Sequence, residues 1–356
     1  MAVDQVTLLG MTALANIIKA MIAEEGPMPL DRYMTLCLSH PQHGYYMTRD
    51  PLGTAGDFTT SPEVSQVFGE LIGVWVAQVW EQLGSPRHFA LVELGPGRGT
   101  LMADVLRVLT KIPACAKAAD VHFVETSPVL RAAQLDRVPG ATWHSTLVSL
   151  PGLPTILLAN EFFDALPIRQ LEKKQGRVFE RCIGIEEAEL AVGLVPTPNQ
   201  IAFSGEGVFE DSSIRDALAT HLGSHLNQTS GAALIIDYGH MRSALGDTLQ
   251  AMRAHSFCKI TEHVGEADIT SHVDFESMGR GFAKGGARIA GLMTQGQFLQ
   301  AMGLDIRTRV LAGTTSGEKQ REIIAASERL ANPVQMGDLF KVMAVTGGMK
   351  TPPYPF

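Results

Sequence analysis

Cysteine is scarce in this sequence, and its placement suggests no covalent or metal cross-link. The 356 residues include four cysteines: Cys37, Cys115, Cys182 and Cys258. No two of them form a C-x-x-C pair. Such scattered thiols argue against a disulfide framework and against a zinc site of the usual ligand spacing. We therefore predict reduced cysteines, no bound metal and a cytoplasmic location.

Long basic runs and long apolar runs are also missing. No stretch of five or more lysines and arginines occurs, and the formal net charge is −8, whereas a protein that binds nucleic-acid phosphates needs the opposite balance. The strongest apolar stretch, Leu71–Val76, is too short to cross a bilayer. Residues 1–10 lack the pattern of a signal or transit peptide. We predict no nucleic-acid partner and no membrane insertion, while the acidic balance is compatible with a basic protein substrate.

What the sequence does contain is enough apolar material for a large fold. Hydrophobic residues make up 45% of the chain and charged residues 19%, which fits one large domain with a smaller part. Helical periodicity marks the segments 12–25, 29–38 and 61–83. We predict a helical N-terminal subdomain over 1–85 and a core over 86–356, with insertions at about 167–210 and 238–291.

From residue 86 onward, strand-like and helix-like segments alternate. This pattern predicts an α/β fold with a seven-stranded, mostly parallel sheet covered on both faces. The predicted strands are 89–94, 121–125, 141–144, 155–159, 232–236, 305–310 and 339–345. The predicted helices are 98–111, 128–136, 211–226, 294–302 and 316–330. Short alternating runs after residue 167 indicate a hairpin within the first insertion.

The segment E-L-G-P-G-R-G-T at 93–100 is the most informative one. It joins a predicted strand to a predicted helix through Gly95, Gly97 and Gly99. These glycines let the backbone approach a ligand, and the helix start offers free N–H groups. Glu93 would repel a pyrophosphate but could accept from an ammonium, so we predict S-adenosyl-L-methionine (SAM) rather than a dinucleotide. A glycine-rich turn without a ligand is the alternative.

A second acidic residue, Glu125, ends the predicted strand 121–125. In nucleoside-binding α/β folds, a carboxylate at this place takes the ribose hydroxyls. We predict that role for Glu125. A solvated charge at a strand end is the alternative.

Three polar residues follow the fourth predicted strand: Asn160, Glu161 and Asp164. Because ligands of open α/β sheets lie at the carboxyl ends of the strands, these residues should lie beside the glycine turn. Carboxylates bind a guanidinium bidentately and can orient one of its nitrogens toward a methyl donor. We therefore predict that all three are catalytic. A helix N-cap with an acidic first turn would also explain Asn160 and Glu161, but not Asp164.

Other polar clusters carry weaker signals. The segment 237–240 follows the fifth predicted strand and would face the same edge of the sheet. Asp268, His272 and Asp274 could resemble a metal set, but a polar loop is the interpretation that we adopt. Ser61, in the polar loop 53–63, is interpreted as a helix cap.

With these motifs assembled, the chain resembles the MidA-like family of SAM-dependent methyltransferases. The most specific matching segment is N-E-F-F-D-A-L-P at 160–167. The other matching segments are 39–46, 56–63, 93–100, 124–128, 237–240, 246–251 and 268–275. Together they extend in order over nearly the whole chain.

The resemblance implies a class I methyltransferase core, Rossmann-like, with an added helical N-terminal part and SAM bound at Gly95, Gly97, Gly99 and Glu125. The family includes a mitochondrial complex I assembly factor, for which it implies symmetric dimethylation of an arginine on a complex I subunit. Because residues 1–10 lack an organelle signal, the expected acceptor is the bacterial counterpart of that complex.

The expected function is therefore a protein arginine methyltransferase. Two alternatives stay open. One is an assembly chaperone that retains the fold and acts by binding a partner. The other is a nicotinamide-dependent oxidoreductase, which Glu93 disfavours.

Overall fold

The computed structural model describes residues 12–50, 53, 59–197 and 203–356. Their contacts group the chain into two compact units, each with its own cluster of buried apolar side chains. The first unit is drawn from residues 1–58, 165–214 and 244–271, and the second from 59–164, 215–243 and 272–356.

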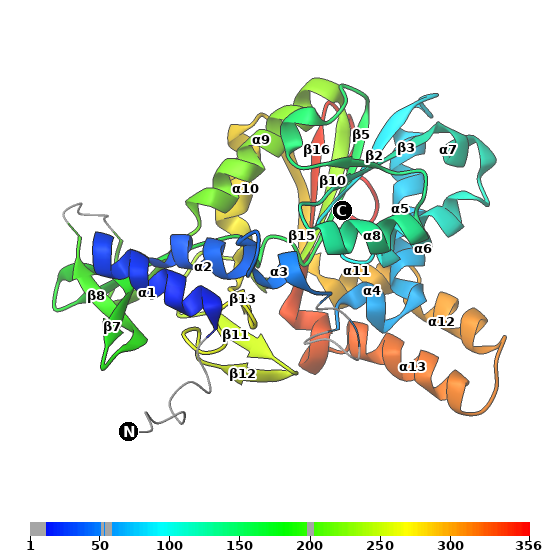
Figure 1. The fold of residues 1–356 in the computed structure, drawn as a ribbon. Coiled ribbons are helices and arrows are strands. Elements are labelled where there is room, and N and C mark those ends of the chain that lie inside the picture. Colours follow the sequence, from blue (N-terminus) through cyan, green and yellow to red (C-terminus); the bar gives the residue numbers. More distant parts are fainter. Residues whose placement is uncertain (1–11, 51–52, 54–58, 198–202) are drawn as a thin grey trace. The chain divides into compact units, whose positions relative to one another are not determined.

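The second unit is built on a sheet of order β15-β16-β10-β5-β2-β3-β4, with the short strand β14 beside β10 (Figure 1). The strands are β2 (Phe89–Leu94), β3 (Ala119–Val124), β4 (Thr142–His144), β5 (Thr155–Asn160), β10 (Gly231–His240), β14 (Val273–Asp274), β15 (Arg288–Thr294) and β16 (Phe340–Gly347). The pairs from β4 to β10 are parallel, whereas β16 runs antiparallel to β10 and β15. The predicted α/β class with a mostly parallel sheet is confirmed.

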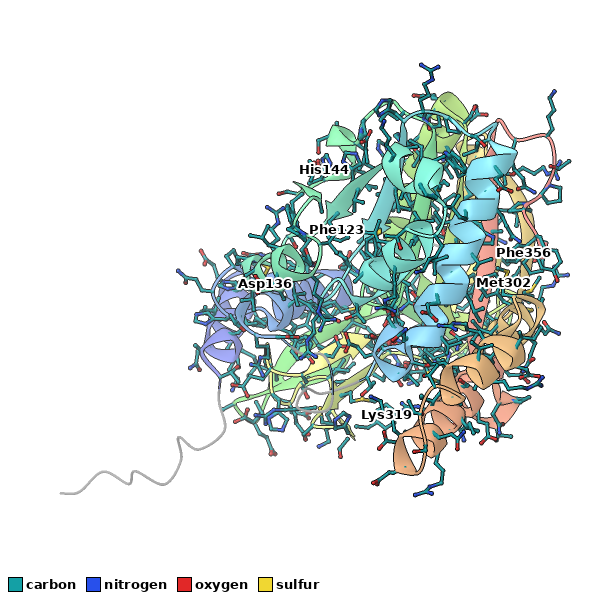
Figure 2. The ribbon with its side chains drawn as sticks, turned by 90° about the vertical axis from the view of Figure 1, so that its right-hand side faces the viewer. Phe123, Asp136, His144, Met302, Lys319 and Phe356 are labelled. Carbon is teal, nitrogen blue, oxygen red and sulfur yellow. The ribbon has the colours of Figure 1, made fainter. Side chains whose placement is uncertain are left out.

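Helices flank this sheet. They are α4 (Ser61–Val64), α5 (Gln66–Gln82), α6 (Thr100–Leu109), α7 (Pro113–Ala118), α8 (Pro128–Arg137), α9 (Ser213–Thr229), α10 (Phe275–Lys284), α11 (Gln295–Ala301), α12 (Leu304–Ala312) and α13 (Glu318–Ala331). Phe123 of β3 is fully buried, and its ring centroid lies 5.9 Å from that of Trp143 on β4 (Figure 2). Aromatic packing therefore closes the sheet at its β4 end.

Helix α5 belongs to the core of this second unit. Its buried apolar side chains are Val67, Phe68, Leu71, Ile72, Trp75, Val76, Val79 and Trp80. Full burial of each large one contributes roughly 1.5–3 kcal/mol. A Cβ added to Gly69 would lie 2.5 Å from Cβ of Asp104 on α6, so the close approach of α5 and α6 requires glycine. The contacts thus place 66–82 with the sheet, which differs from the predicted subdomain boundary at residue 85.

Two predictions about the C-terminal third are wrong. Residues 305–310, predicted as a strand, lie in helix α12. The sheet instead contains β15, which begins within the predicted insertion 238–291 and continues to Thr294. Helix α10 also lies in that insertion. The alternation in 305–310 is misleading because Leu304 and Ala312 are the residues that α12 buries, at a spacing of two helical turns.

The first unit combines three helices with two small sheets. The helices are α1 (Ala13–Glu25), α2 (Leu30–Ser39) and α3 (Tyr45–Thr48). One sheet contains β1 (Met28–Pro29), β6 (Arg169–Lys174), β7 (Arg177–Glu186), β8 (Glu189–Pro196) and β9 (Gly207–Asp211); the other contains β11 (Gln250–Arg253), β12 (Ser256–Cys258) and β13 (Asp268–Thr270). The antiparallel pair of β6 and β7 confirms the predicted hairpin.

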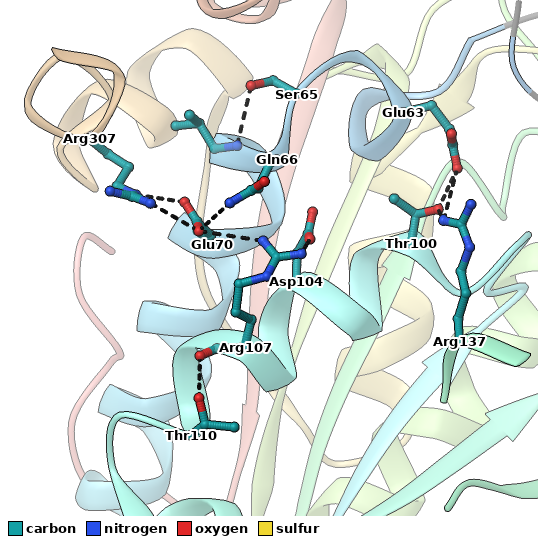
Figure 3. A network of polar contacts seen from close by, with 11 residues as sticks. Glu63, Ser65, Gln66, Glu70, Thr100, Asp104, Arg107, Thr110, Arg137 and Arg307 are labelled. Atoms are coloured by element: carbon teal, nitrogen blue, oxygen red, sulfur yellow. Dashed lines mark hydrogen bonds and ion pairs between the residues drawn. The ribbon is translucent and has the colours of Figure 1, made fainter. Parts of the chain in front are cut away.

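A network of ion pairs joins α5, α6 and α12 in the second unit (Figure 3). Glu70 is buried and accepts two hydrogen bonds from Arg307, from Nε to Oε2 at 2.6 Å and from Nη2 to Oε1 at 3.0 Å. Gln66 donates to Oε1 of Glu70 at 2.9 Å. A bidentate pair of this kind fixes α12 against α5. Among the described residues, no helix is long and apolar enough to cross a membrane.

Candidate functional site

The glycine turn begins directly after β2. Gly95, Gly97 and Gly99 have φ angles of 55°, 53° and 79°, a left-handed conformation that other residues adopt only with strain. A Cβ on Gly95 would lie 2.8 Å from Cδ2 of Phe162. Gly99 is the N-cap residue of α6. The predicted strand, turn and helix are therefore present, and at Gly95 the Phe162 ring occupies the space that a Cβ would need.

Glu93 is a buried carboxyl on β2, with 3% of its surface exposed. Burial raises its pKa to about 8, although the backbone amide of Met102 on α6 opposes this shift. Its Oε2 atom is buried and has no hydrogen-bond partner among the described residues. A buried carboxyl with an unused acceptor is costly in a folded protein. The site is therefore suited to a ligand that brings a cation or a hydrogen-bond donor.

Glu125 follows β3 at the same edge of the sheet and is also buried. Its Oε1 accepts from the backbone N–H groups of Thr126 and Ser127, both at 2.7 Å. Its Oε2 accepts from Nε2 of Gln134 at 3.1 Å. Burial raises the pKa of Glu125, and these hydrogen bonds partly offset the rise. The Glu125 carboxylate is thus held in one orientation by its own loop and by α8.

Asn160 and Glu161 lie where β5 ends. Glu161 has a φ of 50°, which is uncommon for a residue with a side chain and indicates a locally constrained site. Its Oε1 accepts from the backbone N–H of Ser61 at 2.8 Å and from Nδ2 of Asn160 at 3.2 Å. Burial, and then repulsion from Asp164, contribute to a pKa of about 7. Oδ1 of Asn160 is buried without a hydrogen-bond partner among the described residues.

Asp164 lies in the turn after Glu161, and Asp237 of β10 holds that turn. One oxygen of Asp237, Oδ2, accepts from the backbone N–H groups of residues 162, 163 and 164 at 3.2, 2.9 and 3.2 Å. Tyr238 donates its hydroxyl to Oδ2 of Asp164 at 2.7 Å. Burial and the neighbouring carboxyls Asp164 and Glu161 raise the pKa of Asp237 well above its usual value.

Arg215 is the buried cation of this cluster, with 2% of its surface exposed. It donates from Nη2 to the Asp164 carbonyl oxygen at 3.0 Å and from Nη1 to the His272 carbonyl oxygen at 2.8 Å. Asp164 and Asp237 are buried, and Glu161 beside them is half-buried. The charge of Arg215 opposes the rise in the pKa of Asp237. A further cation bound here would favour the ionised forms of these carboxyls.

The structure brings the predicted residues to one edge of the sheet. β2 pairs with both β3 and β5, and β5 pairs with β10, all in parallel. Glu93 is the last residue but one of β2, Glu125 and Glu161 follow β3 and β5, and Asp237 lies within β10, one residue beyond its pairing with β5. Leu94 is opposite Val124 and Ala159, and Asn160 is opposite Ile236. These parallel registers align the four acidic positions along the same edge.

Several residues at this edge were missing from the predicted set. Asp237 could have been included, because it follows an apolar strand as Glu93 and Glu125 do. Arg215 and Gln134 have no such signal, since their partners are distant in the sequence.

Of the loop 53–63, residues 54–58 lie outside the described residues. The prediction that Ser61 caps a helix is wrong: Ser61 is the first residue of α4, whose N-cap is Thr60, and its backbone N–H donates to Glu161.

Helix α4 ends close to the first turn of α6. Glu63 on α4 accepts from the Thr100 hydroxyl, and Arg137 of α8 donates to the same hydroxyl (Figure 3). Arg98 and Arg137 each lie 3.9 Å from a Glu63 carboxylate oxygen. These contacts fix the start of α6 immediately behind the glycine turn.

The three residues considered as a metal set, Asp268, His272 and Asp274, have other partners, and the His272 ring packs edge-on against Tyr238 with centroids 5.5 Å apart. Asp268 lies on β13 of the first unit, where its Oδ1 accepts from the Tyr46 hydroxyl at 2.9 Å. Asp274 caps α10 of the second unit and accepts from the Ser277 N–H at 2.9 Å. Within the part of the chain that the structure describes, no group of three or more His, Cys, Asp or Glu side chains is arranged to hold a metal ion.

Comparisons with known proteins agree with these observations. The sequence profile of a family described as "Putative S-adenosyl-L-methionine-dependent methyltransferase" matches residues 71–293. The mitochondrial protein arginine methyltransferase NDUFAF7 homolog of Drosophila melanogaster is 37% identical, over 96% of this chain and 86% of its own length. The mitochondrial protein arginine methyltransferase NDUFAF7 of Homo sapiens is 34% identical, over 91% of this chain and 81% of its own length.

Solved structures of two Burkholderia thailandensis proteins are also similar. One, bound to S-adenosyl-homocysteine (SAH), has a TM-score of 0.82 and 25% identity, and the match covers 95% of this chain and 92% of that one. The other has a TM-score of 0.81 and 28% identity, with 96% and 93% covered. The similarity therefore includes both units of the chain.

Proposed function

The chain belongs to the family of SAM-dependent methyltransferases and takes SAM as its methyl donor, and from this premise we propose that it methylates an arginine side chain of a protein. Two observations support the arginine acceptor. The curated relatives carry the name protein arginine methyltransferase. The edge of the sheet holds two buried carboxyls, Asp164 and Asp237, and the half-buried Glu161, next to the buried Arg215.

We propose that Glu93, the glycine turn and Glu125 hold SAM. The unused Oε2 of Glu93 supports a contact with the ligand's ammonium group. Gly95, Gly97 and Gly99 provide backbone without Cβ atoms, so the ligand can approach closely. Glu125, fixed by two backbone amides and Gln134, supports a contact with the ribose hydroxyls. When bound, SAM supplies a methyl group on a positively charged sulfur.

We propose that Asn160, Glu161 and Asp164 hold the acceptor guanidinium. Oε1 of Glu161 accepts from the Ser61 N–H and from Asn160, so the carboxyl is held at the end of β5 beside Asp164. Asp164 is oriented by Tyr238. Two carboxylates on one guanidinium stabilise its charge and turn one nitrogen toward the methyl group. The nitrogen then loses a proton, and Glu161 is its acceptor, because burial already favours the protonated form of this carboxyl.

The identity of the acceptor and the compartment are further parts of this proposal. From the family resemblance, we propose a subunit of a complex I-type respiratory enzyme as the acceptor. The names of the relatives place them in mitochondria, whereas we propose the cytoplasm of a bacterium for this chain. No disulfide joins the four cysteines, all of which lie in the described residues, as is usual in either of these reducing compartments.

The proposal is tested by transferring a labelled methyl group from SAM to an extract of cells that lack the protein. We expect label in one protein, and methylated arginine after acid hydrolysis. Asp164→Asn should abolish the transfer while SAH binding, measured by calorimetry, changes little. The same substitution at Asp136, an exposed residue of α8 (Figure 2), is the matched control and should have no effect. Label on lysine or on a small molecule would overturn the arginine acceptor.

A further inference from the structure

Gln134 is a fully buried amide at the centre of the proposed cofactor site. It lies on α8, and 0% of its surface is exposed. Its Nε2 donates to the carbonyl oxygen of Gly97 at 2.7 Å and to Oε2 of Glu125 at 3.1 Å. Its Oε1 accepts from Nε1 of Trp143 at 2.8 Å. One side chain thus connects the glycine turn, the second acidic residue and strand β4.

The orientation of this amide is fixed by Trp143. An indole N–H can only donate, so the atom of Gln134 that faces it must be the oxygen. The two hydrogens on Nε2 are then directed to Gly97 and Glu125, which can both accept. A flipped amide would place two donors against each other at Trp143 and would leave Glu125 facing an oxygen.

The backbone of α8 also lies close to the turn. A Cβ added to Gly99 would lie 3.6 Å from Cα of Gln134. The Gln134 side chain therefore crosses a short gap to the turn. Its ordering has a rotamer cost of about 1.5–2 kcal/mol, which is met on folding and not when the ligand binds.

We propose that Gln134 is the positioning residue of the SAM site: it sets the orientation of the Glu125 carboxylate and the path of the glycine turn at Gly97, so that both meet the ligand in one fixed geometry. This role rests on the proposed contacts of Gly97 and Glu125 with SAM. A preformed site binds more tightly because less ordering is required when the ligand arrives. The Nε2 donor also favours the ionised form of Glu125, the better acceptor for ribose hydroxyls.

The test compares SAH binding by calorimetry in wild-type protein and in Gln134→Met, which keeps the length of the side chain and removes both donors. We expect the affinity for SAH to fall at least about tenfold, because one of the two lost hydrogen bonds is made to the Glu125 carboxylate. Gln170→Met is the matched control: Gln170 is 1% exposed, accepts from Arg181 at 3.1 Å and donates to Glu210 and Asp247 at 2.8 and 2.9 Å, all in the first unit. It should lower the melting temperature and leave SAH binding unchanged.

A second variant, Gln134→Glu, gives a pH signature that loss of packing alone would not produce. At low pH the new carboxyl is protonated and can still donate to one acceptor. As the pH rises it ionises beside Glu125, so the affinity for SAH relative to wild type should fall with increasing pH. Trp143→Phe, which removes only the orienting donor, should weaken binding by a few-fold and covers the case in which Gln134→Met does not fold.

The outcomes separate this inference from the functions on which it rests. If Glu125→Gln weakens SAH binding while Gln134→Met does not, the role of Gln134 is overturned and that of Glu125 stands. If neither variant changes binding, both roles are overturned. If Gln170→Met weakens binding as much as Gln134→Met, the effect is one of general stability and the inference fails. None of these results depends on arginine being the acceptor.

Discussion

Ligand binding should release a proton from Glu93. With a pKa of about 8, this carboxyl is about nine-tenths protonated at pH 7 in the free protein. An ammonium group placed at its unused Oε2 favours the ionised form, so the pKa falls when the ligand binds. We therefore expect about 0.9 proton to be released for each SAH bound at pH 7. The affinity should rise about tenfold from pH 7 toward pH 8 and above, until the ligand's own ammonium deprotonates.

Calorimetry in two buffers of different ionisation enthalpy measures this proton release directly. Glu93→Gln, which cannot titrate, should release about 0.9 fewer protons than wild type under the same conditions. 5′-Methylthioadenosine, a ligand with the adenosine but without the ammonium, is the control and should show no such difference. Equal proton release by wild type and Glu93→Gln would refute the reasoning.

The same group has a consequence for the stability of the free protein. The pKa of Glu93 in the folded protein lies above the value of 4.5 for an exposed carboxyl. At a pH between these two values, the folded state therefore binds more protons at Glu93 than the unfolded state does. The free energy of unfolding should therefore fall as the pH rises through that window, by about 3 kcal/mol between pH 4.5 and pH 7 relative to Glu93→Gln. Urea unfolding of both proteins at the two pH values measures this; parallel pH profiles would contradict it.

Three further predictions concern the turn, the acidic cluster and the ion-pair network. Gly95→Ala should reduce SAH binding at least about tenfold, because its Cβ would displace the Phe162 ring in the turn after β5 and strain a positive φ; unchanged binding by calorimetry would argue against a ligand at this turn. Asp237→Asn should lower kcat or raise KM for the acceptor more than it weakens SAH binding, since it changes the carboxyl whose oxygens accept from the N–H groups of the turn 162–164 and of Tyr238; steady-state kinetics beside calorimetry would show whether this split occurs. Glu70→Gln should lower the free energy of unfolding by about 1–3 kcal/mol, because it breaks the bidentate pair with Arg307; an unchanged urea midpoint would exclude that contribution.

The glycine turn and its two acidic neighbours could be predicted because their signals are local. An apolar strand, a terminal acidic residue and closely spaced glycines all fall within a few residues of Glu93. The same logic applies to Glu125. The parallel sheet then places these strand ends together without any further information from the sequence.

The parts that were missed depend on contacts between distant residues. Arg215 donates to carbonyl oxygens 51 and 57 residues away, and Gln134 reaches a glycine 37 residues away. Strand β15 contains a register shift between Ile289 and Gly291 and is half-buried, which interrupts the period of two expected of a strand. Helix α12 has an alternating sequence. Its Arg307 donates to Glu70 on α5, which is 237 residues away in the chain.

A crystal structure of the protein with bound SAH tests the proposed cofactor site most directly. We expect the SAH amino group within about 2.7–3.2 Å of Oε2 of Glu93 and the ribose hydroxyls against Glu125. The glycine turn should keep the conformation that it has without ligand. Density for SAH at another edge of the sheet, or at this edge with both carboxyls turned away from it, would contradict the site.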